Sequence, residues 1–415
     1  GVTTRDEIAW LARRAGWGLR PGELDELTAL GTDAVIDLLV EPDANGIAPE
    51  PSPWDDFAYV DDQEQRQEQG LETLERWVEH LLDTGRPFEN AMAWFWHDHF
   101  AVSVAVVQYL PSMIGHLELL RSRALGSFRE LIREVTTDVA MLVFLDGATS
   151  TGDSPNENYG RELLELYTLG IGNFTEDDVR AAAAALTGWV VRRRFGWAVE
   201  FIPFRHDDTP QTFLGVDGIR DVDGVVDTAV SHPATPGFIA SKVARHYLGA
   251  VDQATIAGLA ESFAAADLAI APLGRAVLEA GLDGAGSAMV LAPVPWTVQA
   301  LKATGAAPPP RLLIGQLRLM GQVPGNPPNV GGFPGASTWL ASSATAGRFT
   351  AAGGIARLTP DESPVLAAAA SGAWDELADL LLRPSGFSQP TLDALRALPA
   401  TTSRRPGEAA LALAL

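Results

Sequence analysis

Residues 154–189 read SPNENYGRELLELYTLGIGNFTEDDVRAAAAALTGW. Ser154 and Glu157 have the spacing of a capping box, in which each side chain satisfies a free backbone N–H of the other residue. Proline is favoured at the first helical position, so this spacing predicts a helix that begins at about Pro155. Gly170 and Gly172 then end the helix.

The second half of this stretch predicts another helix in the same way. Thr175 and Asp178 repeat the capping-box spacing. The helix dipole also stabilises the acidic residues in the first turn. Gly188 stands where a left-handed C-terminal cap is expected. Two capped helices are therefore expected to meet at a short Gly-Asn corner.

Outside this stretch, apolar residues recur at helical spacing along most of the chain. Trp189 to Phe204 is the exception, since its β-prone residues on either side of Arg-Phe-Gly indicate a hairpin. The predicted fold class is mainly α, a multi-helix array with one small β-hairpin or sheet. We expect one continuous globular unit in four regions: short helices over 1–45, a helical core with the charged motifs over 46–188, the hairpin and a polar loop over 189–224, and helices over 225–415.

Composition limits the class of protein. The chain of 415 residues is 47% hydrophobic and 20% charged, which is typical of a folded soluble protein. Its formal charge of −23 argues against binding to nucleic acid or to an anionic membrane surface. The absence of cysteine excludes disulfides and thiolate sites. No stretch is long and apolar enough to predict a membrane span, so the cytoplasm is the expected location, with export of a processed precursor left open.

The helix after Pro155 carries two acidic side chains on one face. At 3.6 residues per turn, Asn158, Glu162 and Glu165 fall on one side of it. Carboxylates three residues apart can bind a divalent cation, or raise each other's pKa so that one serves as a general acid. Arg161 lies four residues from both Glu157 and Glu165, so a solvated ladder of ion pairs is an equally good interpretation.

Two histidines lie within the aromatic segment Trp94 to Phe100. His-x-His pairs often bind metals, but residues two apart on a helix point in nearly opposite directions. Only one of His97 and His99 is therefore expected to reach a given site. Alternatively, both are structural histidines near the C-terminus of a helix, where the dipole favours them.

His206 and Asp207 follow the predicted hairpin in a polar loop. Loops on a rigid scaffold often carry functional residues, so His206 is the strongest single histidine. A simple turn stabilised by Asp207 or Asp208 is the alternative. The basic run Arg192 to Arg194 either binds a substrate anion or pairs with acidic residues on the hairpin surface.

At these residues the chain resembles a large bacterial family known only as domain of unknown function 1800. The resemblance covers nearly the whole length and rests on several motifs in order: Ala12-Arg13-Arg14-Ala15-Gly16-Trp17-Gly18, Phe95-Trp96-His97-Asp98-His99-Phe100, Asn156-Glu157-Asn158-Tyr159-Gly160-Arg161-Glu162-Leu163, Tyr167-Thr168-Leu169-Gly170, Thr175-Glu176-Asp177-Asp178-Val179, Leu186-Thr187-Gly188-Trp189, His206-Asp207 and Pro328-Asn329-Val330-Gly331-Gly332-Phe333-Pro334-Gly335. The family pattern has Asn at the position of Asp98 and often Trp at that of Phe333, so local packing is expected to differ there.

The resemblance implies no activity. Members often neighbour genes for a phosphatase-like family of exported proteins, which implies a phosphatase-like partner and export for some of them. The polar motifs of the family coincide with His97, Glu162, Glu165 and His206. If these four converge, they offer imidazole and carboxylate ligands suited to zinc, iron or manganese.

The leading hypothesis is therefore a metal-dependent enzyme, hydrolytic or oxidative, acting on a small or polar substrate. His97, Glu162, Glu165 and His206 are the predicted metal ligands, Asp207 and Glu165 are candidate catalytic residues, and Asn158 or Arg161 orients the substrate. Two alternatives stay open. One is a metal-free helical scaffold that docks a partner through its acidic surface, and the other is a metal-free hydrolase that uses the Glu162 and Glu165 pair.

Overall fold

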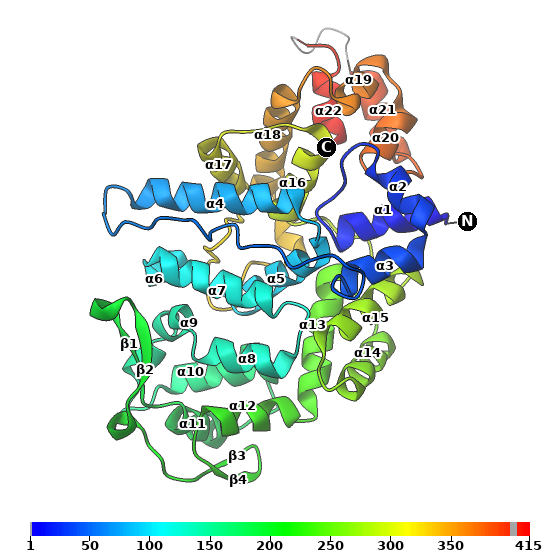
Figure 1. The fold of residues 1–415 in the computed structure, drawn as a ribbon. Coiled ribbons are helices and arrows are strands. Elements are labelled where there is room, and N and C mark those ends of the chain that lie inside the picture. The colour runs from blue at the N-terminus through cyan, green and yellow to red at the C-terminus, as the bar shows by residue number, and fades with distance from the viewer. Residues whose placement is uncertain (1, 399–404) are drawn as a thin grey trace. The chain divides into compact units, whose positions relative to one another are not determined.

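The structure, a computed structural model, describes residues 2–398 and 405–415. Most of this part is helical, as Figure 1 shows, and the strands form two small two-stranded sheets. The prediction of a mainly α fold is confirmed. Among the described residues, none of the helices is sufficiently long and apolar to span a membrane.

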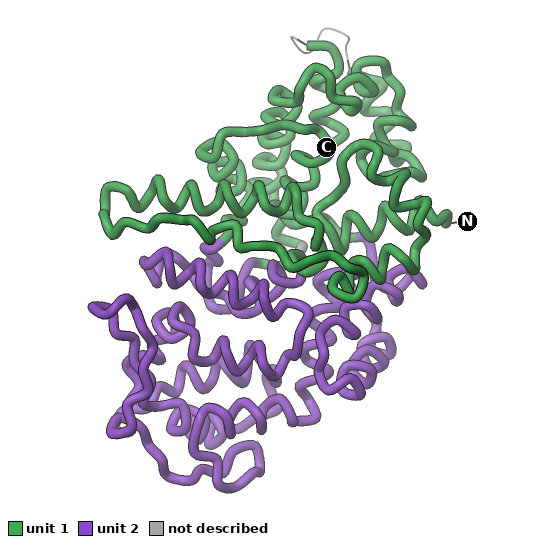
Figure 2. The backbone as a smooth tube through the Cα atoms, in the orientation of Figure 1, with its two compact units in different colours: residues 1–91, 289–324, 334–415 green, residues 92–288, 325–333 purple. Residues whose placement is uncertain are grey.

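The chain divides into two compact units, drawn in different colours in Figure 2. Unit 1 comprises residues 1–91, 289–324 and 334–415, and unit 2 comprises residues 92–288 and 325–333. Each unit is thus assembled from segments that are far apart in the sequence. Helix α5 (Pro87–His99) begins in unit 1 and carries its last eight residues into unit 2.

Unit 1 is helical throughout its regular structure. Its helices are α1 (Thr4–Arg14), α2 (Glu23–Leu30), α3 (Thr32–Val40), α4 (Arg66–Asp83), α16 (Pro293–Thr304), α17 (Pro310–Met320), α18 (Ser342–Leu358), α19 (Pro364–Ser371), α20 (Trp374–Leu380), α21 (Gln389–Ala397) and α22 (Glu408–Ala414). Helix α4 is amphipathic, and it buries Leu74, Val78 and Leu81 as its apolar spacing predicts.

Unit 2 contains the stretch that decides the fold. Its helices are α6 (Val104–Val107), α7 (Leu110–Ser122), α8 (Phe128–Thr136), α9 (Val139–Phe144), α10 (Glu157–Glu162), the π-helix η2 (Leu163–Thr168), α11 (Glu176–Ala185), α12 (Val222–Ser231), α13 (Ala234–Leu248), α14 (Gln253–Ala265) and α15 (Ile270–Leu282). Its strands are β1 (Trp189–Arg192), β2 (Ala198–Phe201), β3 (Gln211–Phe213) and β4 (Val216–Ile219).

An aromatic cluster forms part of the core of unit 2. The rings of Trp96 and Phe100 stack with their centroids 5.8 Å apart. The ring of Phe128 also contacts Trp96, with the two centroids 5.7 Å apart. All three side chains are fully buried. Burying each large apolar side chain contributes roughly 1.5–3 kcal/mol, so this cluster firmly fixes the C-terminal half of α5.

The helix after residue 154 begins differently from the sequence prediction. Its N-cap is Asn156, whose side chain accepts a hydrogen bond from the N–H of Tyr159 at 3.0 Å, and the helix starts at Glu157. Ser154 instead forms a backbone bridge with Thr151. The predicted cap at Thr175 is confirmed, since Thr175 and Asp178 form a reciprocal capping box at the start of α11.

The second half of this helix is a π-helix, which the sequence did not predict. Residues Leu163–Thr168 are wound more widely than an α-helix, and the Leu169 N–H donates to the Leu164 carbonyl five residues earlier. The hydroxyl of Thr168 donates to the Leu163 carbonyl at 2.7 Å. A π-helix is rare and is often found at functional sites.

Helices α10 and α11 pack against each other at close range. A Cβ atom at Gly160 would lie 2.8 Å from the carbonyl oxygen of Val179 and 3.1 Å from the backbone nitrogen of Ala183. Only glycine leaves room for this approach. The alanine-rich sequence of α11 gives the matching smooth surface, because its five consecutive alanines are all buried.

The predicted hairpin is confirmed, and a second one follows it. Strands β1 and β2 pair antiparallel with Trp189 opposite Phe201. Strands β3 and β4 pair across a tight turn at Leu214 and Gly215, both with positive φ. Leucine is an unusual residue in such a turn, which explains why the sequence predicted only a polar loop there.

Candidate functional site

His97 and its neighbour His99 point to different partners, as expected for residues two apart on a helix. The ring Nε2 of His97 accepts a hydrogen bond from the backbone N–H of Gly325 at 2.9 Å. Burial lowers the pKa of His97 to about 3, so the ring is neutral and its proton lies on Nδ1. This Nδ1 is buried without a hydrogen-bond partner. In this arrangement neither nitrogen offers a lone pair to a metal ion.

His99 is part of a buried polar chain that includes Lys242 of α13. The His99 Nε2–H donates to the carbonyl of Tyr167 at 3.1 Å, so its Nδ1 accepts from the Lys242 ammonium at 3.2 Å. Lys242 also donates to the carbonyl of Leu166 at 3.2 Å. These two carbonyls are near the C-terminal end of η2, where a helix leaves its carbonyls unpaired and favours a positive charge.

Asp98 faces the segment 325–333 of the same unit. Its Oδ1 accepts a hydrogen bond from the N–H of Phe333 at 2.6 Å. Burial raises the pKa of Asp98, while this hydrogen bond and the charge of Lys242 oppose the rise. Gly332 has φ 88°, and a Cβ atom there would lie 2.4 Å from the Asp98 carboxylate. Positions 98 and 333, at which the resemblance implies a departure from the family pattern, are thus in direct contact.

Glu162 and Glu165 are both half-buried on the helix formed by α10 and η2. Burial raises the pKa of Glu162, the charge of Glu165 raises it further, and Arg161 opposes the rise. Neither carboxylate has a hydrogen bond or an ion pair with another side chain among the described residues. Neither carboxylate is therefore held in an ion pair within the described part of the chain, although the charge of Arg161 acts on both.

Arg161 does not compensate these two acids directly. Its guanidinium donates two parallel hydrogen bonds of 2.7 Å to the carboxylate of Glu176, the first residue of α11. The predicted ladder from Glu157 through Arg161 to Glu165 is therefore replaced by a forked ion pair between two helices. Asn158, the other residue expected to orient a substrate, is exposed on α10.

His206 and Asp207 lie beside the segment that precedes α10. The His206 Nδ1–H donates to the carbonyl of Thr187 at 3.0 Å, and the Asp207 N–H donates to the hydroxyl of the same threonine at 2.8 Å. Gly188 has φ 96°, and a Cβ atom there would collide with the His206 side chain at 2.9 Å. The Asp207 carboxylate accepts from the Thr209 N–H at 3.0 Å, and the hydrogen bond to Thr209 lowers its pKa.

This hydrogen bonding fixes the state of the His206 ring. A ring that donates through Nδ1 keeps the lone pair of its neutral form on Nε2, the arrangement that most metal-binding histidines adopt. Of the four predicted ligands, His206 is therefore the best prepared for a metal. However, residues 2–398 and 405–415 contain no group of three or more His, Asp or Glu side chains placed to hold a metal ion. The structure does not bring His97, Glu162, Glu165 and His206 into one such centre.

Sequence reasoning missed Lys242. Burial lowers the pKa of Lys242 to about 8, and the charge of Asp98 opposes this effect. Its ammonium lies 5.1 Å from the centroid of the Phe238 ring. One signal was present, because the chain has only two lysines, Lys242 and Lys302. Nothing in the sequence linked it to His99, 143 residues away.

Comparison with known families gives one match. The model of the family described as "Protein of unknown function (DUF1800)" matches residues 10–415. No curated protein matches the chain. No solved structure matches it either.

Proposed function

We propose that this chain, which belongs to the DUF1800 family, is a hydrolytic enzyme that uses Glu162 and Glu165 as a pair of acid–base groups. The single observation that supports this proposal is the pairing of two half-buried carboxylates that have no counter-ion within the described part of the chain. The substrate class that suits such a pair is a small polar molecule with a bond cleaved by proton transfer and water attack.

The raised pKa of Glu162 decides which of the two carboxylates is assigned the role of proton donor. Burial and the neighbouring charge raise the pKa of Glu162, so this residue is the better proton donor. Glu165 is then assigned the second role, in which a carboxylate acts on water as a base.

The surrounding contacts support a fixed position for the pair. Glu162 is the last residue of α10 and Glu165 is the third residue of η2, and both sit on a helix that the cap at Asn156 and the close contact at Gly160 hold in place. At its other end, Lys242 and His99 bind the carbonyls of Leu166 and Tyr167. Acid–base groups on rigid elements keep their geometry during a reaction.

The test compares three single variants of the full chain on panels of small esters, amides, phosphoesters and glycosides. We expect E162Q and E165Q each to lose activity by about 10²–10⁴-fold, because that is the usual contribution of a general acid or base. E157Q is the matched control, since Glu157 is an exposed carboxylate on the same helix. Equal activity in E162Q, E165Q and E157Q on a substrate that the wild-type protein cleaves would reject the proposal.

A metal-dependent reaction at His206 and Asp207 is the second candidate function. It is favoured by one observation, the Nδ1–H hydrogen bond from His206 to Thr187, which leaves Nε2 as the nitrogen able to bind zinc, iron or manganese. Such a metal would supply an activated water. The chain's own contribution is to hold the imidazole and the Asp207 carboxylate beside each other through Thr187 and Thr209.

Elemental analysis and calorimetric titration with Zn²⁺ and Mn²⁺, on protein purified without a histidine tag, test this second candidate. We expect one metal per chain in the wild-type protein and loss of binding in H206A. The control is H232A, because His232 lies in the same unit and its Nδ1 accepts a hydrogen bond from the N–H of Ala234. Equal metal uptake by H206A and H232A would exclude His206 as a ligand.

A further inference from the structure

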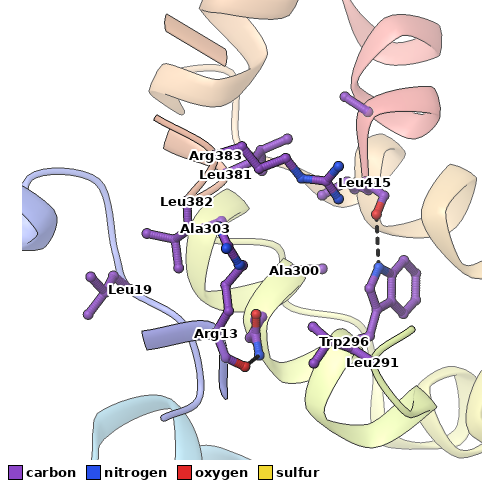
Figure 3. A pocket seen from close by; sticks show the side chains of 12 residues that line it. Arg13, Leu19, Leu291, Trp296, Ala300, Ala303, Leu381, Leu382, Arg383 and Leu415 are labelled. Carbon is purple, nitrogen blue, oxygen red and sulfur yellow. Dashed lines mark hydrogen bonds between the residues drawn. The ribbon is translucent and has the colours of Figure 1, made fainter. Parts of the chain in front are cut away.

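Unit 1 contains a cavity of about 70 Å³, which is separate from the residues considered so far. Figure 3 shows that two arginines from distant parts of the sequence line it, Arg13 of α1 and Arg383 after α20. Most of the remaining lining is apolar, and includes Leu19, Leu291 and Trp296. The indole N–H of Trp296 donates to the backbone oxygen of Leu415 at 2.9 Å, so this polar atom is already satisfied.

The two arginines have no counter-ion. No carboxylate within residues 2–398 or 405–415 forms an ion pair with either guanidinium, although the chain has 53 acidic residues against 30 lysines and arginines. All of these acidic residues belong to the described part of the chain. Arginine side chains elsewhere in unit 1 do have such partners, as Arg5 has in Asp379 and Asp25.

The positive charges are also close enough to act on one another. Burial lowers the pKa of Arg13 to about 10, and the charges of Arg383 and Arg14 lower it further, while Asp6 acts in the opposite direction. Arg14 is itself half-buried, with a buried Nη1 that has no hydrogen-bond partner. The Arg383 guanidinium also lies 5.8 Å from the centroid of the Phe387 ring. Partly buried like charges that lack an ion-pair partner are costly, and a bound anion lowers that cost.

The backbone is strained at Leu382, the residue that precedes Arg383 at the cavity. Leu382 has φ 61°, a left-handed conformation that usually belongs to glycine. It follows the end of α20, and the Arg383 N–H closes this helix by donating to the Ala378 carbonyl at 2.8 Å. Leucine here buries its side chain in the cavity wall, where glycine would leave a gap. Such strain is often retained at ligand sites.

We propose that this cavity binds a small organic acid, with its carboxylate or phosphate group between Arg13 and Arg383 and its carbon atoms against Leu19 and Trp296. Arginine is well suited to this role, because its planar guanidinium binds both kinds of oxyanion through paired hydrogen bonds. Since a buried water needs at least about 10–15 Å³ of such volume, the cavity has room for more than a single water and suits a small molecule.

Calorimetric titration of the full chain with three probes tests the proposal: isobutyrate, inorganic phosphate and isobutyramide. Isobutyramide is the uncharged counterpart of isobutyrate and has the same number of non-hydrogen atoms. We expect isobutyrate, phosphate or both to bind the wild-type protein and to raise its melting temperature, and isobutyramide to do neither. Binding of isobutyrate alone identifies a carboxylic acid as the ligand class, and binding of phosphate alone identifies a phosphate.

Two neutral variants and two controls locate the site. R13Q and R383Q should each weaken binding at least tenfold, whereas R396Q, which changes an exposed arginine on α21, should bind like the wild-type protein. R13K keeps the positive charge. If R13Q binds weakly, comparison with R13K shows whether the variant has lost the anion contact or its fold. The proposal is overturned if no charged probe binds, or if R383Q binds as tightly as R396Q.

Discussion

Lys242 combines partial burial with two hydrogen bonds, and its titration can be followed directly. We expect its pKa to be about 8, because burial penalises the ammonium. With only two lysines in the chain, reductive ¹³C-methylation gives one set of signals for each lysine besides that of the N-terminal amine, and the K242R variant assigns the Lys242 set. A titration of the Lys242 signal near pH 10.5, the ordinary value for lysine, would contradict this prediction.

The same shift makes stability depend on pH. The folded protein holds the Lys242 proton less tightly than the unfolded chain does, so the free energy of unfolding should rise between pH 8 and about 10.5. The rise attributable to this group is at most on the order of 3 kcal/mol, since one pKa unit corresponds to about 1.36 kcal/mol. Urea unfolding of the wild-type and K242M proteins across this pH range measures the rise. The free energy of unfolding should increase with pH more steeply in the wild-type protein than in K242M.

Asp98 should give a pH dependence of stability that is opposite in sign to that of Lys242. Burial raises its pKa in the folded protein, so its contribution to stability falls as the pH rises from about 4 towards neutrality. D98N should remove this dependence and keep the acceptor for the Phe333 N–H, whereas D98A should lose about 1–3 kcal/mol by leaving that N–H unpaired. Urea unfolding at pH 4 and pH 7 distinguishes the two. Equal stability of D98N and D98A would show that this hydrogen bond contributes nothing.

At the scale of the element, the start of α10 offers a clear comparison. N156A should destabilise the protein by about 1 kcal/mol, because it removes the cap on the Tyr159 N–H. S154A should have almost no effect, since Ser154 lies before the helix and is exposed. Chemical denaturation measures both. A larger loss of stability in S154A than in N156A would contradict this assignment and favour the capping box at Ser154 that the sequence predicted.

Helix positions were predicted well because each amphipathic helix encodes its buried face and its caps in its own residues. The capping box at Thr175 and Asp178 is an example, since both partners lie within four residues. The π-helix is different. The carbonyls of Leu166 and Tyr167 near its C-terminal end are bound by Lys242 and His99, which lie 76 and 68 residues away. Local spacing contains no information about such partners.

At the scale of the whole molecule, the two compact units should unfold in separable steps, because each has its own set of internal contacts. Thr3 and Thr175 are matched probes, since each forms a capping box with an aspartate at the start of a helix, one in each unit. By calorimetry, T3A should shift one transition and T175A the other, each by a few degrees. A single transition shifted equally by both variants would contradict this expectation.

The candidate site was only partly predictable, because its residues are brought together by the fold of the whole chain. The sequence indicated Glu162, Glu165, His206 and Asp207 individually, because charged residues within helices and loops stand out against apolar neighbours. It did not indicate which of them share a site, since that depends on where α10, the loop after β2 and α5 lie in the fold. Lys242 and the counter-ion of Arg161 were missed for the same reason.

The glycine at position 160 has a consequence for evolution as well as for packing. With the α10 backbone almost touching that of α11, no side chain can be introduced between them without pushing the acidic face out of register. The helix cannot turn about its axis or slide to adapt to a new substrate. Under the proposed function, changes in specificity should therefore arise in the loops around the carboxylates, and G160A should lose turnover although no polar residue has been substituted.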